Sequence, residues 1–127
     1  MGELEKTTKR FFDLLEQKDV EPIIQDFADD VQAVDEISRR WMRGAGELGA
    51  YMRQLVKMAD NVHTDISDAN ETVRGDIGLM TCWMEQDYTL EGKSQHVSAP
   101  TTIAFRKESG AWKMLLFHSI PLAPEEA

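Results

Sequence analysis

The sequence predicts one α+β domain in which three N-terminal helices pack on a largely antiparallel sheet. Two observations lead to this prediction: apolar residues repeat with a helical period up to residue 58, and long runs rich in Val, Ile, Thr, Trp and Phe follow from residue 61. Helices first and a meander of strands afterwards is an α+β layout. We find no internal repeat, low-complexity tract or linker, so residues 1–127 are predicted to form a single domain.

Three amphipathic segments are predicted to form the helices. The first covers residues 3–18 and places Leu4, Phe11 and Leu15 on one face. A short second helix has Asp19 as candidate N-cap and is predicted to end near Asp29. In the third segment, residues 46–58, the apolar residues form one stripe: Leu48, Tyr51, Met52, Leu55 and Met58.

The remaining segments are predicted to be strands. Residues 31–35 indicate a brief first strand, and the charged segment that follows, up to Gly44, indicates a loop or a weak strand. Turn signals at Glu91-Gly92 and Ser109-Gly110 divide the later part of the chain. The predicted long strands are residues 62–73, 76–90, 94–107 and 111–120.

Two of these strands are apolar on both faces. In residues 111–120, strict alternation puts Leu115 and Phe117 on one face. In residues 76–84, Met80 and Met84 share a face opposite other apolar side chains. An antiparallel strand with one solvated face alternates apolar with polar residues, so both faces are predicted to be covered. The helices can cover only one, so these four side chains predict a homodimer through the sheet face.

Composition excludes several classes of partner and location. The net charge of −9 and the pI near 4.7 argue against a nucleic acid or an anionic membrane surface as partner, because both attract clustered Lys and Arg. A single cysteine, Cys82, allows no internal disulfide and fits a reducing compartment. With no signal-peptide pattern at the start and no run of about 18 apolar residues, we expect a cytoplasmic protein.

Two segments carry a family resemblance. Residues 27–35 (FADDVQAVD), after two amphipathic helices, resemble the corresponding stretch of the ketosteroid isomerase and SnoaL-like families of the nuclear transport factor 2-like superfamily. Residues 110–121 (GAWKMLLFHSIP) look like the last strand of the SnoaL-like group. The resemblance implies a cone-shaped half-barrel, a cystatin-like α+β roll, with a pocket inside and commonly a dimer. Members of these families include isomerases, cyclases, dehydratases, hydrolases and proteins without catalysis.

The resemblance also assigns positions in the site. Asp35 matches the general base of the isomerases, while their oxyanion-hole tyrosine falls on Phe11 and their protonated aspartate falls near Thr102. Phe11 cannot donate a hydrogen bond, and the hydroxyl of Thr102 is a weaker donor than a carboxylic acid. Since losing one oxyanion donor costs about 100- to 1000-fold in rate, this arrangement argues against ketosteroid isomerisation.

Asp35 and His118 are the candidate catalytic residues. Asp35 ends a strand on the parity of Val31 and Ala33, so its carboxylate could face the interior and serve as a base. The alternative is an Asp that caps a loop. His118 could supply a second proton if its strand face lines the pocket. The alternative is a histidine whose ring nitrogens bond to a backbone carbonyl or a neighbouring side chain.

Aromatic and apolar side chains are predicted to line the pocket, and Glu85 could form an acid pair with Asp35. The candidate pocket-lining residues are Phe11, Trp41, Tyr51, Trp83, Glu85, Thr102, Trp112, Met114 and Leu116. No metal-ligand spacing and no nucleotide-binding motif is present, so we expect neither a metal nor a cofactor. The predicted function is cofactor-independent proton transfer on a hydrophobic carbonyl compound by an isomerase, cyclase or dehydratase. The alternative is a ligand-binding or dimeric association module.

Overall fold

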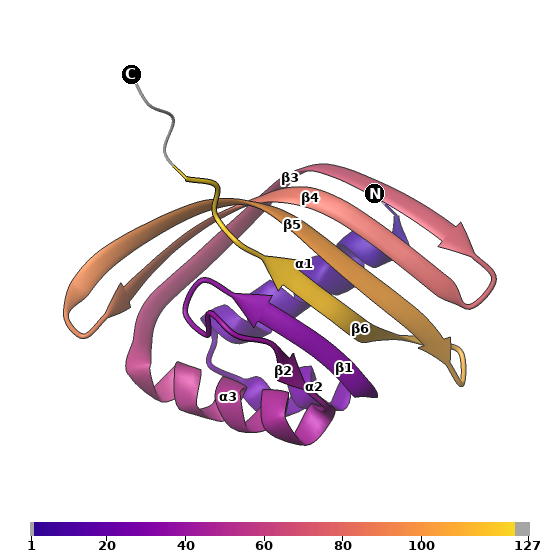
Figure 1. Cartoon of the computed structure of the whole chain (residues 1–127), viewed down its shortest axis with the longest axis horizontal. Helices are drawn as coiled ribbons and strands as arrows, with labels where there is room; N and C mark the ends of the chain where they lie inside the picture. The colour runs from indigo at the N-terminus through magenta and orange to yellow at the C-terminus, as the bar shows by residue number, and fades with distance from the viewer. Residues whose placement is uncertain (1, 124–127) are drawn as a thin grey trace.

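The computed structural model describes residues 2–123, which form three helices and one six-stranded sheet (Figure 1). The helices are α1 (Glu3–Glu16), α2 (Val20–Gln25) and α3 (Ala45–Met58). The strands are β1 (Phe27–Asp35), β2 (Met42–Arg43), β3 (Ala59–Arg74), β4 (Ile77–Leu90), β5 (Lys93–Glu108) and β6 (Ala111–Ser119). The sheet order is β2-β1-β6-β5-β4-β3, with β1 and β6 parallel and the other neighbours antiparallel.

The predicted α+β class and the order of its elements are confirmed. The element boundaries differ by up to four residues, and the largest differences are at the end of the second helix and the start of the first strand. The second helix ends at Gln25, and Phe27 already belongs to β1 rather than to the helix. The apolar spacing that suggested a longer helix arises because Phe27 turns into the same core as Ile23. In the part of the chain that the structure describes, none of the helices has the length and apolar composition that crossing a bilayer requires.

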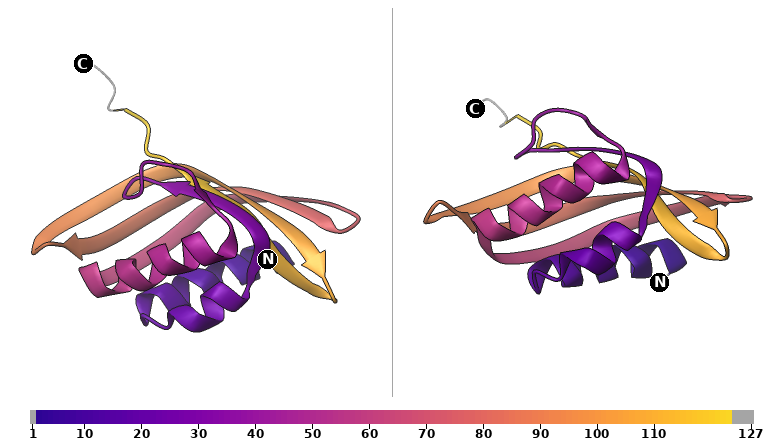
Figure 2. Two further views of the ribbon diagram at one scale, coloured as in Figure 1. Left: turned by 60° about the horizontal axis from the view of Figure 1, so that its bottom comes forward. Right: turned by 90° about the horizontal axis from the view of Figure 1, so that it is seen from below.

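All three helices lie beneath one face of the bent sheet, which we call the concave face (Figure 2). The first helix is attached there by its N-terminus, where the Glu71 carboxylate of β3 accepts the N–H groups of Leu4 (3.0 Å) and Glu5 (3.3 Å). A carboxylate at this position satisfies free donors and complements the helix dipole. Gly78 of β4 permits the close approach, because a Cβ there would lie 2.8 Å from the Leu4 side chain.

A β-bulge in β6 decides which of its side chains face the helices. Phe105 pairs with Met114 and Ala104 pairs with Leu116, which leaves Leu115 as an extra residue in the strand. An extra residue reverses the alternation of faces beyond it. Met114 and Phe117 are therefore both buried on the concave face, and strict alternation through this strand is wrong.

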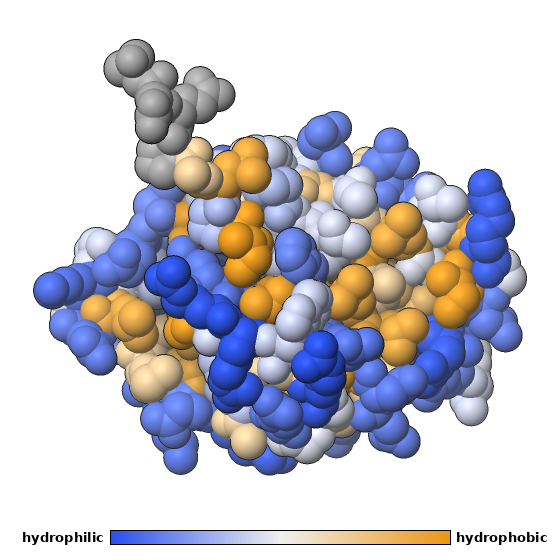
Figure 3. All heavy atoms as spheres, in the orientation of Figure 1, coloured by the Kyte–Doolittle hydropathy of each residue, from blue (hydrophilic) through white to orange (hydrophobic). Residues whose placement is uncertain are grey.

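The same reversal changes the residues of the opposite, convex face. Phe117, Met80 and Met84, which the sequence placed on the uncovered side, are buried in the core beneath the helices. The convex face presents Leu79, whose side chain is 42% exposed, and Ile77, which is 46% exposed. Figure 3 shows this face, where apolar side chains lie among charged ones over the strands.

Candidate functional site

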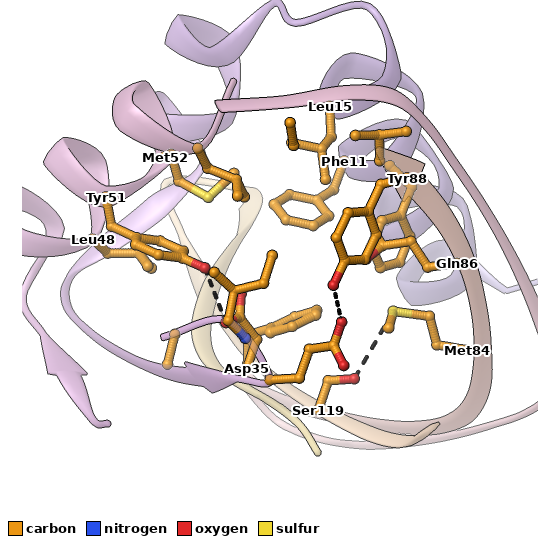
Figure 4. A pocket seen from close by; sticks show the side chains of 18 of the residues that line it. Phe11, Leu15, Asp35, Leu48, Tyr51, Met52, Met84, Gln86, Tyr88 and Ser119 are labelled. Carbon is orange, nitrogen blue, oxygen red and sulfur yellow. Dashed lines mark hydrogen bonds between the residues drawn. The ribbon is translucent and has the colours of Figure 1, made fainter. Parts of the chain in front are cut away.

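A cavity lies between the helices and the concave face of the sheet, with about 60 Å³ that the centre of a water molecule can reach (Figure 4). One water needs about 10–15 Å³ of such volume, so the cavity has room for a few waters. Its apolar walls include four methionines: Met42, Met52, Met84 and Met114. Methionine side chains are flexible, so a ring-sized molecule can be admitted by their rearrangement.

Asp35 and Tyr51 form the first polar pair of this cavity. Asp35 is the last residue of β1, and Tyr51 lies on the inward stripe of α3. The Tyr51 hydroxyl lies 2.9 Å from each Asp35 carboxylate oxygen, as Figure 4 shows for the two side chains. Burial, and then the negative charge of Asp35, raise the pKa of Tyr51 well above its ordinary value. The phenol therefore stays protonated and donates to the carboxylate.

The Asp35 carboxylate also closes the turn that follows β1. Its Oδ1 accepts the backbone N–H groups of Ile37 (3.0 Å) and Ser38 (2.8 Å), while the Asp35 N–H donates to the Ser38 hydroxyl (3.1 Å). The two alternatives for Asp35, a cavity residue or a loop cap, are both present in one side chain. These bonds fix the carboxylate in place and occupy Oδ1 more fully than Oδ2.

Glu36 and Tyr88 form a second polar pair at the same cavity. The Tyr88 hydroxyl donates to the Glu36 carboxylate, and both residues line the cavity. Burial, and then this hydrogen bond, raise the pKa of Tyr88 above its ordinary value. The sequence analysis missed the pair. Tyr88 lies on the same face of β4 as Met84, and this alternation could have placed Tyr88 at the cavity. Glu36 is 52 residues away in the sequence, and only the turn after β1 brings it to Tyr88.

Two further polar side chains line the cavity, and both are already hydrogen-bonded. The Gln86 amide donates to the Thr64 hydroxyl at 2.9 Å. The Ser119 hydroxyl lies 2.8 Å from the hydroxyl of Thr101, and either can be the donor. Ser119 is buried, and its neighbour across the parallel β1–β6 pair is Asp35.

Of the residues that the sequence analysis proposed for the site, the structure brings four to the cavity: Phe11, Asp35, Tyr51 and Met114. The others do not line it: Trp41, Trp83, Glu85, Thr102, Trp112, Leu116 and His118. Trp112 is on the helix side, but its indole donates to Glu3 at the beginning of α1 (3.0 Å). It packs there beside Gly78, outside the cavity.

His118 lies away from the cavity that Asp35 lines. The Leu115 bulge turns His118 and Leu116 to the convex face, where His118 pairs across the strands with Thr102. Its ring lies 5.8 Å from that of Trp41, which is 42% exposed. Asp35 faces the cavity, so the two candidate catalytic residues lie on opposite sides of the sheet.

Trp83 and Glu85 also lie on the convex face, because the even-numbered residues of β4 face the helices. The Trp83 indole donates to the Ser98 hydroxyl (2.7 Å), which donates in turn to Glu85 (2.8 Å). The Ser98 hydrogen bond lowers the pKa of Glu85. His96 bridges Glu85 and Asp87, so Glu85 belongs to a surface network rather than to an acid pair with Asp35.

Comparison with known proteins identifies the family. The sequence matches the family model of the SnoaL-like domain over residues 4–123, and the chain belongs to this family. The predicted resemblance to the nuclear transport factor 2-like superfamily is thereby confirmed. A comparison with curated protein sequences finds no match.

Solved structures share the fold at low sequence identity. A proposed dehydratase of the NTF2-like family from Streptomyces avermitilis is 18% identical, with 95% of each chain covered and a TM-score of 0.87. A proposed calcium/calmodulin-dependent protein kinase II association domain from Xanthomonas campestris is 16% identical, with 94% of this chain and 86% of that chain covered and a TM-score of 0.83. A ketosteroid isomerase-like protein from Erwinia carotovora atroseptica is 15% identical, with 94% of each chain covered and a TM-score of 0.78.

Proposed function

We propose that the cavity binds a small, largely apolar carbonyl compound and that Asp35 transfers a proton within it, without a cofactor. The observation that carries the proposal is a carboxylate at the wall of an apolar cavity, with the Tyr51 hydroxyl 2.9 Å from both of its oxygens. The reaction would be that of an isomerase, cyclase or dehydratase. The descriptions of a dehydratase and a ketosteroid isomerase-like protein among the similar structures favour this range of reactions.

The chemistry follows from the two side chains. Asp35 takes a proton from the carbon beside the carbonyl group, and the electrons of the C–H bond move into the carbonyl to form an enolate. Tyr51, whose raised pKa keeps it protonated, turns from the neutralised carboxyl to donate to the enolate oxygen. Asp35 then returns the proton to another carbon in an isomerisation, or to a departing hydroxyl group, which leaves as water, in a dehydration.

Proton exchange tests this proposal directly. Apolar ring ketones and aldehydes are screened by thermal shift, since a ligand at 100 times its Kd adds about 2.7 kcal/mol of stability. Compounds that bind are then incubated with the protein in D₂O, and NMR is expected to show loss of the proton beside the carbonyl. Binding without any exchange would instead favour the ligand-binding module, and stabilisation by sugars or nucleotides alone would contradict the apolar pocket.

A homodimer through the convex face is our second proposal. The observation that favours it is the exposure of Ile77 and Leu79 on a face where Trp83 and Leu116 are also only partly covered. The description of one similar structure as an association domain supports the same use of the fold. We also propose that the protein is cytoplasmic, because a chain with a single cysteine, Cys82, forms no internal disulfide and fits a reducing compartment.

Light scattering at micromolar concentration is expected to give twice the chain mass of 14.5 kDa. Leu79→Asp should give the monomer, because dimerisation would bury a charge without a partner. Leu122→Asp is the matched control: Leu122 is 67% exposed and lies beyond the end of β6, so its replacement should leave the dimer intact. A monomeric wild-type protein would contradict the proposal.

A further inference from the structure

Both tyrosine hydroxyls of the cavity already donate hydrogen bonds, whereas its two carboxylates have lone pairs that accept none. The Tyr51 hydroxyl donates to Asp35, as a dashed line in Figure 4 shows, and the Tyr88 hydroxyl donates to Glu36. One N–H of the Gln86 amide is used outside the cavity. Each carboxylate offers about four lone-pair sites. Among the described residues, Asp35 Oδ2 accepts one hydrogen bond and Glu36 Oε2 accepts none. A ligand therefore meets acceptors here.

The cavity also lacks a counter-charge. Among the residues of the described chain that line it, none is Lys, Arg or His, and no basic side chain forms an ion pair with either carboxylate. The two carboxylates lie close enough to act on the same groups: the charges of Asp35 and Glu36 both raise the pKa of Tyr51. Two negative charges beside apolar walls favour a positive charge between them.

We propose that this cavity selects apolar molecules that carry a protonated amine. The ammonium group would donate to the free oxygen of Glu36, beside the charge of Asp35, while the apolar body would lie against the walls formed by α1, α3 and β6. The inference rests on the cavity of the proposed function, and it narrows the substrate to a carbonyl compound that also contains a basic nitrogen.

The same geometry disfavours a ligand with a carboxylate. Such a ligand would bring a third negative charge to the cavity, and it would find the tyrosine hydroxyls already engaged with Asp35 and Glu36. Like charges placed against each other in a desolvated site weaken binding. Selection by charge is therefore expected to be stronger than selection by the shape of the apolar body.

Three probes with the same aromatic body test the charge preference at pH 7: 2-phenylethylamine, 2-phenylethanol and 3-phenylpropanoate. By calorimetry and ligand-observed NMR, the amine is expected to bind at least about tenfold more tightly than the alcohol, and the carboxylate more weakly than both. Glu36→Gln keeps an acceptor for Tyr88 but removes the charge, and it should weaken amine binding about tenfold. Alcohol binding should change little.

Asp76→Asn is the matched control, because it removes an exposed carboxylate from the β3–β4 turn, away from the cavity. It should leave amine binding unchanged. Three results would each overturn the inference: the carboxylate binds as tightly as the amine, the amine Kd is unchanged in Glu36→Gln, or the amine does not bind up to about 10 mM. Amine binding without proton exchange on any carbonyl compound would support the amine preference and reject catalysis. Proton exchange without an amine preference would support catalysis and reject the amine preference.

Discussion

Replacing Asp35 with Asn is expected to lower kcat for proton transfer by at least about 100-fold, the usual effect of losing a general base. The amide has the shape of the carboxylate and keeps an oxygen that can accept the N–H groups of Ile37 and Ser38. It cannot take up a proton from carbon. The turn after β1 should therefore remain folded while catalysis is lost, and kcat at saturating substrate is the measurement that separates the two.

His118→Gln is the matched control for this experiment. The sequence made His118 a candidate acid, but its side chain lies on the convex face beside Trp41, so kcat should stay within a few-fold of wild type. Circular dichroism and the melting temperature of both variants check that the fold is retained. Full activity in Asp35→Asn would reject Asp35 as the base and transfer that role to Glu36, the other carboxylate of the cavity.

The fold was predictable from the sequence because its local patterns agree with the tertiary structure. The apolar stripe of α3 and the turn residues between the long strands gave the elements within a few residues. Asp35 and Tyr51 were both proposed for the pocket. Asp35 follows the strand alternation of Val31 and Ala33, and Tyr51 belongs to the apolar stripe of α3. Their hydrogen bond was not foreseen, because nothing in either local pattern specifies how α3 crosses β1.

The sequence did not reveal which side chains of β6 point to the helices and which to the convex face. The strand is apolar on both faces, so its pattern does not reveal that Leu115 is an extra residue. That single insertion places Phe117 in the cavity and turns Leu116 and His118 outward. The Glu36–Tyr88 pair was missed for a related reason, because a turn rather than a periodic element positions Glu36.

Replacing Phe105 with Ala is expected to lower the free energy of unfolding by about 3–5 kcal/mol, the range for deleting a fully buried aromatic ring. Phe105 is 0% exposed on the concave face of β5, and it already borders a small gap beside Phe27 and Met114. The neighbouring side chains are held by the sheet and by α1, so they can fill the new space only in part. A loss of this size removes a large fraction of the about 5–15 kcal/mol that stabilises a typical domain.

Ile103→Val provides the matched control for Phe105→Ala, since Ile103 is also 0% exposed and lies on the same face of the same strand. It removes one methyl group and should cost about 0.5–1.5 kcal/mol. Urea unfolding at one fixed protein concentration measures both variants, and unchanged m-values would show that the midpoints report stability alone. If Phe105→Ala costs no more than Ile103→Val, the core around β5 can collapse into the space of the lost ring, and the rigid packing inferred for this end of the sheet is wrong.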